Sequence, residues 1–145
     1  MKYEEFLSKV RKRARFASNE EAENATQATL VTFAERLTSN EAEQLAAQLP
    51  PELAVYMKAL DTVTGESFTL DEFFRRVGLR EGVEPVDADY HARVVLALIA
   101  ESVSMGEIED VRAQLPQDFA KLLDVENEGE IPELGTVAVE EDENA

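Results

Sequence analysis

The chain has 145 residues, of which 44% are hydrophobic, and a formal net charge of −17 at pH 7. This length suits one domain, and the apolar content is sufficient for a buried core. The chain contains no cysteine, which excludes disulfides, zinc sites with thiolate ligands and cysteine nucleophiles. The negative charge disfavours free nucleic acid and anionic membranes as partners, and it favours cationic partners or a saline environment.

Nothing at the start of the chain predicts a secretory signal, because Glu4, Glu5, Lys9 and Arg11 interrupt it before an apolar run forms. The longest apolar run covers residues 94–100, whereas a membrane helix needs about 20 residues. We therefore expect a cytoplasmic protein without a membrane span.

The first part of the chain predicts two helices. Residues 2–15 carry an apolar stripe at helical spacing, and a second helix is expected to continue to about residue 37. Ser18 and Glu21 form a capping box at the start of the second helix. The stripe of the first helix consists of Tyr3, Phe6, Leu7 and Val10, and the inward positions of the second are Ala22, Ala25, Thr29, Leu30, Phe33 and Leu37.

Two further helices meet at the phrase Ala-Gln-Leu-Pro, residues 47–50. Thr38 and Glu41 offer a capping box for the third helix, with Ser39 as a competing cap, and this helix is expected to reach residue 48. A residue that precedes proline is disfavoured in a helix, so the helix ends before Pro50. Proline suits the first turn of a helix, so a fourth helix begins here, and the phrase predicts a structural corner.

The same pattern then returns after a polar, turn-rich connection at residues 59–68. Capping boxes at Thr69 and Ser104 start two helices, Gly82 ends the first of them, and Pro85 opens a helix between them. The phrase Ala-Gln-Leu-Pro recurs at residues 113–116, which is 66 positions after its first copy. Ala34-Glu35 is likewise matched by Ala100-Glu101, and the apolar stripe of the first helix is matched by Leu70, Phe73, Phe74 and Val77.

This repetition predicts an all-α fold, a compact helical domain of two tandem pseudo-symmetric four-helix units. The duplicated domain covers residues 1–123, with repeat one at about 3–57 and repeat two at about 70–123. Residues 124–145 contain nine acidic residues and no lysine or arginine, so we expect an acidic, flexible tail.

The aligned halves resemble the bacterial and archaeal domain-of-unknown-function family 2267. The resemblance covers residues 1–123 and implies an all-helical duplicated domain, with no known activity, cofactor or catalytic residue. It rests on phrases in a fixed order, which are residues 3–7, 25–30, 34–37 and 45–50 in the first half and residues 73–77, 91–95 and 111–116 in the second.

No residue pattern predicts catalysis, a cofactor or a metal site. His91 is the only histidine, and a general acid or base normally needs a partner and a substrate cleft. Asp87 lies one helical turn away and Asp89 is expected to point elsewhere, so we expect a locally satisfied side chain. A helical di-iron site needs Glu-x-x-His on two helices, and Ala88 stands three residues before His91.

The strongest candidate for a binding surface is basic. Six of the 14 basic residues lie in the first sixteen positions, and three arginines occupy the matching helix of the second half. These side chains could bind a phosphate, an acidic partner or the acidic tail, or they could be solvated helix faces that balance the surrounding acid. The candidate residues are Lys9, Arg11, Lys12, Arg13, Arg15, Arg75, Arg76 and Arg80.

We expect a non-enzymatic intracellular interaction or scaffold protein with an unknown protein partner. A small-ligand-binding protein or enzyme with a site between the two halves is the alternative, and a deep polar cleft containing His91 would favour it. A nucleic-acid-associated protein is a third option, which a continuous positive stripe joining Lys12, Arg13, Arg75 and Arg76 would favour.

Overall fold

The computed structural model describes residues 1–58 and 65–124, and in these ranges the fold is all-α. The predicted tail beyond residue 124 and part of the predicted connection, residues 59–64, lie outside the described residues. The helices are α1 (Tyr3–Arg13), α2 (Asn19–Arg36), α3 (Ser39–Ala46), α4 (Pro51–Met57), α5 (Leu70–Glu81), α6 (Pro85–Ser102), α7 (Met105–Ala113), α8 (Gln117–Ala120) and the 3₁₀ helix η1 (Lys121–Leu123).

All four predicted caps start helices. The side chains of Ser18, Thr38, Thr69 and Ser104 each accept a hydrogen bond of 3.1–3.2 Å from the backbone amide three residues later. Thr38, rather than the competing Ser39, caps α3. Each bond satisfies an amide that the first turn of a helix otherwise leaves without a partner.

The helices are shorter at their ends than predicted. α1 ends at Arg13, α3 ends at Ala46 and α4 begins at Pro51. The corner residues Leu49 and Leu115 are buried, as their place before a proline and after an amphipathic helix suggested. At each Ala-Gln-Leu-Pro phrase, one helix ends, the leucine is buried and the next helix begins after the proline.

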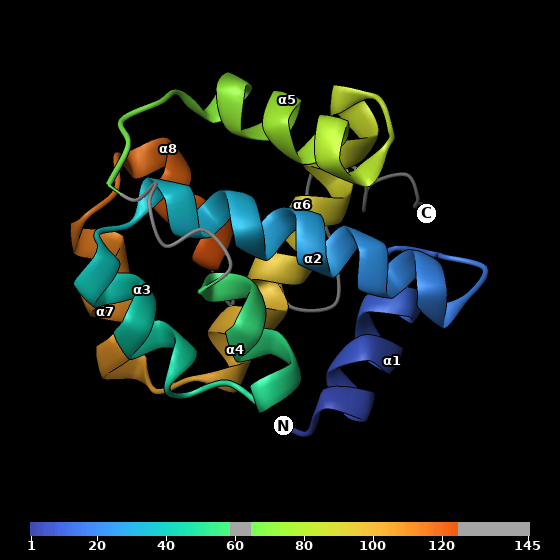
Figure 1. The fold of residues 1–145 in the computed structure, drawn as a ribbon, viewed down its shortest axis with the longest axis horizontal. Coiled ribbons are helices and arrows are strands. Elements are labelled where there is room, and N and C mark those ends of the chain that lie inside the picture. The colour runs from blue at the N-terminus through green and yellow to red at the C-terminus, as the bar shows by residue number, and fades with distance from the viewer. Residues whose placement is uncertain (59–64, 125–145) are drawn as a thin grey trace, which may run out of the picture.

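The long helices α2 and α6 form the centre of the molecule. Helix α2 packs against α1, α4, α5 and α6, and α6 also packs against α1, α5 and η1. Figure 1 shows α2 crossing the molecule with α6 behind it, and α1 and α5 on opposite sides of α2. All six residues predicted to face inward are buried; five lie in α2, and the sixth, Leu37, is its C-terminal cap.

Phenylalanine rings connect these helices in the core. Phe73 of α5 has its ring centroid 6.3 Å from that of Phe33 in α2 and 5.5 Å from that of Phe119 in α8, both in edge-to-face geometry. All three rings are fully buried. Burial of one such side chain contributes about 1.5–3 kcal/mol, so this cluster ties three helices together.

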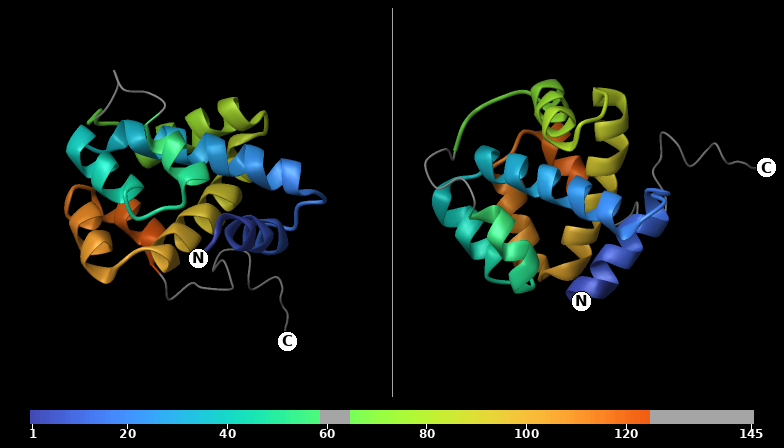
Figure 2. Two further views of the ribbon diagram at one scale, coloured as in Figure 1. Left: turned by 60° about the horizontal axis from the view of Figure 1, so that its bottom comes forward. Right: turned by 45° about the vertical axis from the view of Figure 1, so that its right-hand side comes forward.

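Helices from the two predicted repeats pack against each other. Helix α1 contacts both α2 and α6, and α5 contacts both α6 and α2. Helices α3 and α7 lie side by side in both Figure 1 and Figure 2 and are in contact. Helices of each predicted repeat thus pack against helices of the other. This packing places polar side chains from distant parts of the sequence next to one another.

Candidate functional site

The basic residues predicted as a binding surface fall into two groups with different surroundings. The first group belongs to α1 and the turn after it, and the second belongs to α5. The partners of each guanidinium or ammonium group decide whether it can bind another molecule.

In the first group, Arg13 is held inside the fold. Its guanidinium donates two hydrogen bonds, of 2.8 and 3.4 Å, to Glu101 of α6. Its backbone carbonyl accepts a hydrogen bond of 2.6 Å from the hydroxyl of Tyr90. Arg13 therefore joins α1 to α6 and is not part of a free basic surface.

The other cations of this group face solvent to different degrees. Lys9 lies 3.6 Å from Glu5 in an exposed pair one helical turn apart, an arrangement of little energetic consequence. Arg11 is half-buried, and its Nε has no hydrogen-bond partner among the described residues. Lys12 and Arg15 are exposed and form no ion pair with any described residue.

Arg15 has an unusual backbone conformation for its residue type. Its φ is 62°, in the left-handed region, and the amide of Phe16 donates a 2.9 Å hydrogen bond to the carbonyl of Arg11. This bond closes α1 with the helix ending that usually contains glycine. A side chain raises the energy of the left-handed conformation by roughly 1 kcal/mol or more, so Arg15 is a locally strained cation.

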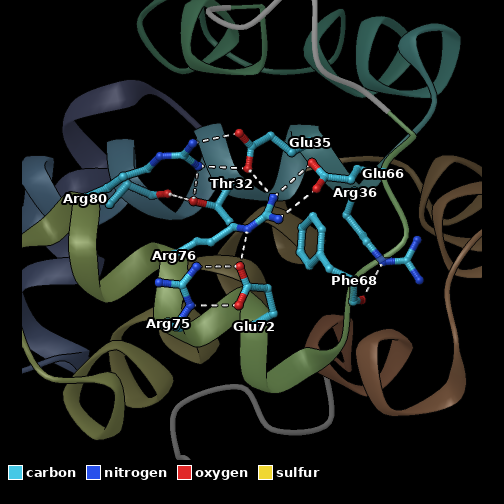
Figure 3. A network of polar contacts seen from close by, with 10 residues as sticks. Thr32, Glu35, Arg36, Glu66, Phe68, Glu72, Arg75, Arg76 and Arg80 are labelled. Carbon is cyan, nitrogen blue, oxygen red and sulfur yellow. Dashed lines mark hydrogen bonds and ion pairs between the residues drawn. The ribbon is translucent and has the colours of Figure 1, made fainter.

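The second group is engaged in a network around a buried acid (Figure 3). Glu35 of α2 is 4% exposed. Arg80 donates two hydrogen bonds to its carboxylate, of 2.7 and 3.0 Å, and Arg76 donates a third, of 3.2 Å. Arg80 also donates to the hydroxyl of Thr32 at 2.8 Å. These contacts supply the charge that a buried carboxylate needs.

Arg76 also binds two further carboxylates. It donates bonds of 2.8 and 3.0 Å to Glu66 and one of 2.7 Å to Glu72, which Arg75 holds with two bonds of 2.7 Å. The hydrogen bonds from Arg75 and Arg76 lower the pKa of Glu72 to about 2, and the bond from Arg76 lowers the pKa of Glu66. The pKa of Arg76 rises in return.

The segment between residue 65 and α5 is anchored by aromatic contacts with this network. The guanidinium of Arg76 lies 4.1 Å from the ring centroid of Phe68, within the range of a cation–π contact. Arg36 donates a 3.1 Å hydrogen bond from Nε to the carbonyl of Phe68, and its guanidinium lies 5.0 Å from the ring of Phe119. Figure 3 shows Phe68 between the two arginines.

These contacts determine what the predicted basic residues can do. The three arginines of α5 and Arg13 are paired with acids. Among the described residues, therefore, no continuous positive stripe connects Lys12 and Arg13 with Arg75 and Arg76. Glu35 is not among the residues predicted from the sequence to bind or to pair. The repeated Ala-Glu phrase could have indicated these pairs, since Glu35 pairs with Arg80 and its counterpart Glu101 pairs with Arg13.

His91 is satisfied, as expected, but its partner Glu81 lies on another helix and was not predicted from the sequence. Its Nδ1 lies 2.5 Å from Oε2 of Glu81, which is buried at the end of α5. The imidazole also contacts the ring of Phe16, with centroids 4.5 Å apart. Neighbours one turn away in the sequence gave no sign of this contact, because it arises from the packing of α5 against α6.

An open groove of about 430 Å³ lies between the start of α1 and the corner that joins α3 to α4. Its lining residues are 1–4 and 47–52. It does not include His91, so it is not the polar cleft that would favour an enzyme with a site at this histidine. No group of three or more histidine, aspartate or glutamate side chains among the described residues could hold a metal ion.

A family model described as "Uncharacterized conserved protein (DUF2267)" matches residues 3–122. The chain belongs to domain-of-unknown-function family 2267. The match confirms the resemblance seen in the sequence, and family 2267 contributes no activity or site residue. A comparison with curated proteins gives no match. No described helix of this family member is long and apolar enough to cross a bilayer.

Proposed function

We propose that the protein is a non-enzymatic interaction protein that binds an acidic protein segment at the end of α1. The observation that carries this proposal is the difference in pairing between its cations. Lys12 and Arg15 are exposed and form no ion pair with any described residue, whereas Arg13, Arg76 and Arg80 are bound to internal carboxylates.

The conformation of Arg15 supports this assignment. At the corresponding end of α5, the amide of Val83 donates a 2.9 Å bond to the carbonyl of Gly78, and the residue in the left-handed conformation is Gly82. Strain at a backbone position points to a role for the side chain that occupies it. An arginine at the end of α1 also interacts favourably with the helix dipole, so stability alone accounts for part of its presence.

The charge of the whole molecule limits the size of the partner. A protein with a net charge of −17 repels a long polyanion, and binding to nucleic acid requires the neutralisation of many phosphates. A short acidic segment needs only the local cations Lys9, Arg11, Lys12 and Arg15. Its binding is expected to be weak and sensitive to salt, because exposed ion pairs are screened.

The test is the binding of a fluorescently labelled oligo-glutamate peptide at low ionic strength, measured by anisotropy. The double variant Lys12→Glu/Arg15→Glu should weaken binding by about tenfold, because two exposed ion pairs become repulsive contacts. The matched control is Lys58→Glu/Lys121→Glu, which changes the net charge equally at two exposed lysines outside α1. Binding by the control should change much less.

Two outcomes would contradict the proposal. Equal weakening by both double variants would mean that the peptide responds only to net charge. Tighter binding of an oligonucleotide than of the peptide, lost in the α1 variant, would favour a nucleic-acid-associated protein instead.

A further inference from the structure

Two glutamates meet where α3 and α7 pack against each other. Glu41 and Glu107 each occupy the third position of their helix, and their side chains are 5% and 7% exposed. Their amides donate to the caps Thr38 and Ser104. In a capping box the glutamate side chain also accepts a hydrogen bond from a backbone amide near the cap. Glu21 does so, because its carboxylate accepts from the amide of Ala17. Glu41 and Glu107 instead contact each other.

This contact requires a proton. The two buried carboxyl groups lie at the contact of α3 with α7, where Glu107 is within hydrogen-bond reach of Glu41, and an ionised carboxylate can only accept. One oxygen of each group, Oε2, is buried and accepts a hydrogen bond from no described donor. Two negative charges at this place would lack compensation, whereas one proton between the groups removes the repulsion and supplies the donor.

No cation among the described residues forms an ion pair with Glu41 or Glu107. Gln114 donates a 3.2 Å hydrogen bond to Glu41, and the charged groups that act on Glu107 are Glu41 and Asp110, both acidic. Arg112, the cation of α7, is bound to Asp124. Helices α4 and α8, which pack against α3 and α7, carry the acids Glu52 and Asp118. Burial and the contact with Glu41 raise the pKa of Glu107 to about 7.

Reciprocal hydrogen bonds keep the two carboxyl groups together. The side chain of Gln48, in the first corner, accepts a 2.8 Å bond from the amide of Ser104 at the start of α7. Gln114, in the second corner, accepts a 3.3 Å bond from the amide of Thr38 at the start of α3. These bonds hold the starts of α3 and α7 together and so keep both glutamates at one interface.

We propose that Glu41 and Glu107 share one proton, and that this proton controls how tightly α3 packs against α7. The dipoles of both helices favour a negative charge at their first turns, so one of the two groups stays ionised. When the proton is lost, the two carboxylates repel each other and the contact loosens.

The direction of the pH effect follows from linkage. A carboxyl group whose pKa is higher in the folded protein than in the unfolded chain binds its proton more tightly when folded. Its stabilisation is complete below the unfolded value, near pH 4.5, and is lost as the pH rises through about 7. This is opposite to the effect of an ion-paired glutamate.

The experiment compares urea unfolding of five full-length proteins at about pH 5 and about pH 8. These are the unchanged protein, Glu107→Gln, Glu41→Gln, and the controls Glu109→Gln and Glu43→Gln, which remove one exposed charge from the same helices. The unchanged protein and both controls should be less stable at the higher pH. Glu107→Gln and Glu41→Gln should lose most of this dependence, because a glutamine amide donates the hydrogen bond at either pH. Equal pH dependence in all five proteins would overturn the proposal.

A second measurement does not depend on the variants folding. Carbon-13 NMR of the glutamate carboxyl groups in the unchanged protein should show one group with an apparent pKa near 7. Titration of every glutamate below about pH 5 would overturn the proposal. Stabilisation by calcium at about pH 8 that the glutamine variants abolish would identify a bound cation instead of a proton, and would equally overturn it.

Discussion

Arg80 of α5 holds the carboxylate of Glu35 in α2 with two hydrogen bonds, of 2.7 and 3.0 Å. Arg13 of α1 holds Glu101 of α6 in the same bidentate manner. Each pair joins an outer helix from one half of the chain to a central helix from the other half. Arginines that the sequence presented as binding residues thus stabilise the packing of the two halves.

The pair formed by Arg80 and Glu35 is expected to matter for stability. Arg80→Met should lower the free energy of unfolding by about 1.5–3 kcal/mol, because a buried carboxylate loses two charged hydrogen bonds. Arg75→Met is the control and should have a much smaller effect, since the partner of Arg75, Glu72, is more exposed than Glu35. Chemical denaturation measures both. Similar losses in the two variants would mean that burial of Glu35 is unimportant.

The left-handed residues Arg15 and Gly82 allow backbone strain to be separated from charge. Arg15→Gly should be more stable than Arg15→Ala by about 1 kcal/mol, because both remove the cation and only glycine relieves the strain. Gly82→Ala should be less stable than the unchanged protein by a similar amount. An added Cβ at this glycine meets no atom within 4 Å, so the backbone alone decides the effect.

Thermal unfolding of these three variants provides the measurement. If Arg15→Gly and Arg15→Ala melt at the same temperature, the φ of 62° stores no strain. Peptide binding by Arg15→Gly, which keeps Lys12, should also weaken if the arginine side chain is part of the proposed binding surface.

His91 is expected to serve the fold and not the proposed binding surface. His91→Ala should destabilise the protein, because it leaves the buried Glu81 without a partner. His91→Gln keeps a donor near Glu81 and should be less harmful. Both should bind the oligo-glutamate peptide within about twofold of the unchanged protein when folded. A tenfold loss in a folded His91→Gln variant would overturn this prediction.

The packing of the two halves predicts that neither folds alone. Residues 1–64 produced by themselves lack the partners of α1 and α2, which include α5 and α6. Circular dichroism should show no cooperative unfolding for this fragment or for residues 65–145, and a cooperative transition should appear when the two are mixed. Independent cooperative unfolding of either fragment would show that the predicted repeats are separate folding units.

The acidic C-terminal residues are expected to compete with the peptide for the cations of α1. Removal of residues 125–145 deletes eight acidic residues and should strengthen peptide binding at low salt. The effect should be lost in the Lys12→Glu/Arg15→Glu background. If the truncated protein gains as much affinity in that background, the tail acts only through net charge.

The sequence by itself determined the helices, their starts and the two corners. Ser18, Thr38, Thr69 and Ser104 cap helices because a hydroxyl and an amide three residues apart meet locally, whatever the rest of the chain does. The apolar periodicity likewise selected the buried faces of α1 and α2. These features depend on neighbours within one or two helical turns, which a sequence displays directly.

Only the tertiary structure decided the partners of the polar side chains. Arg80 meets Glu35, His91 meets Glu81, and Glu41 meets Glu107 because helices from different parts of the chain pack face to face. An exposed arginine and an ion-paired arginine look alike in a sequence, since both occupy polar positions of an amphipathic helix. Burial of an acid on the facing helix distinguishes them, because a desolvated carboxylate needs charged hydrogen-bond donors, which the nearest guanidinium groups supply.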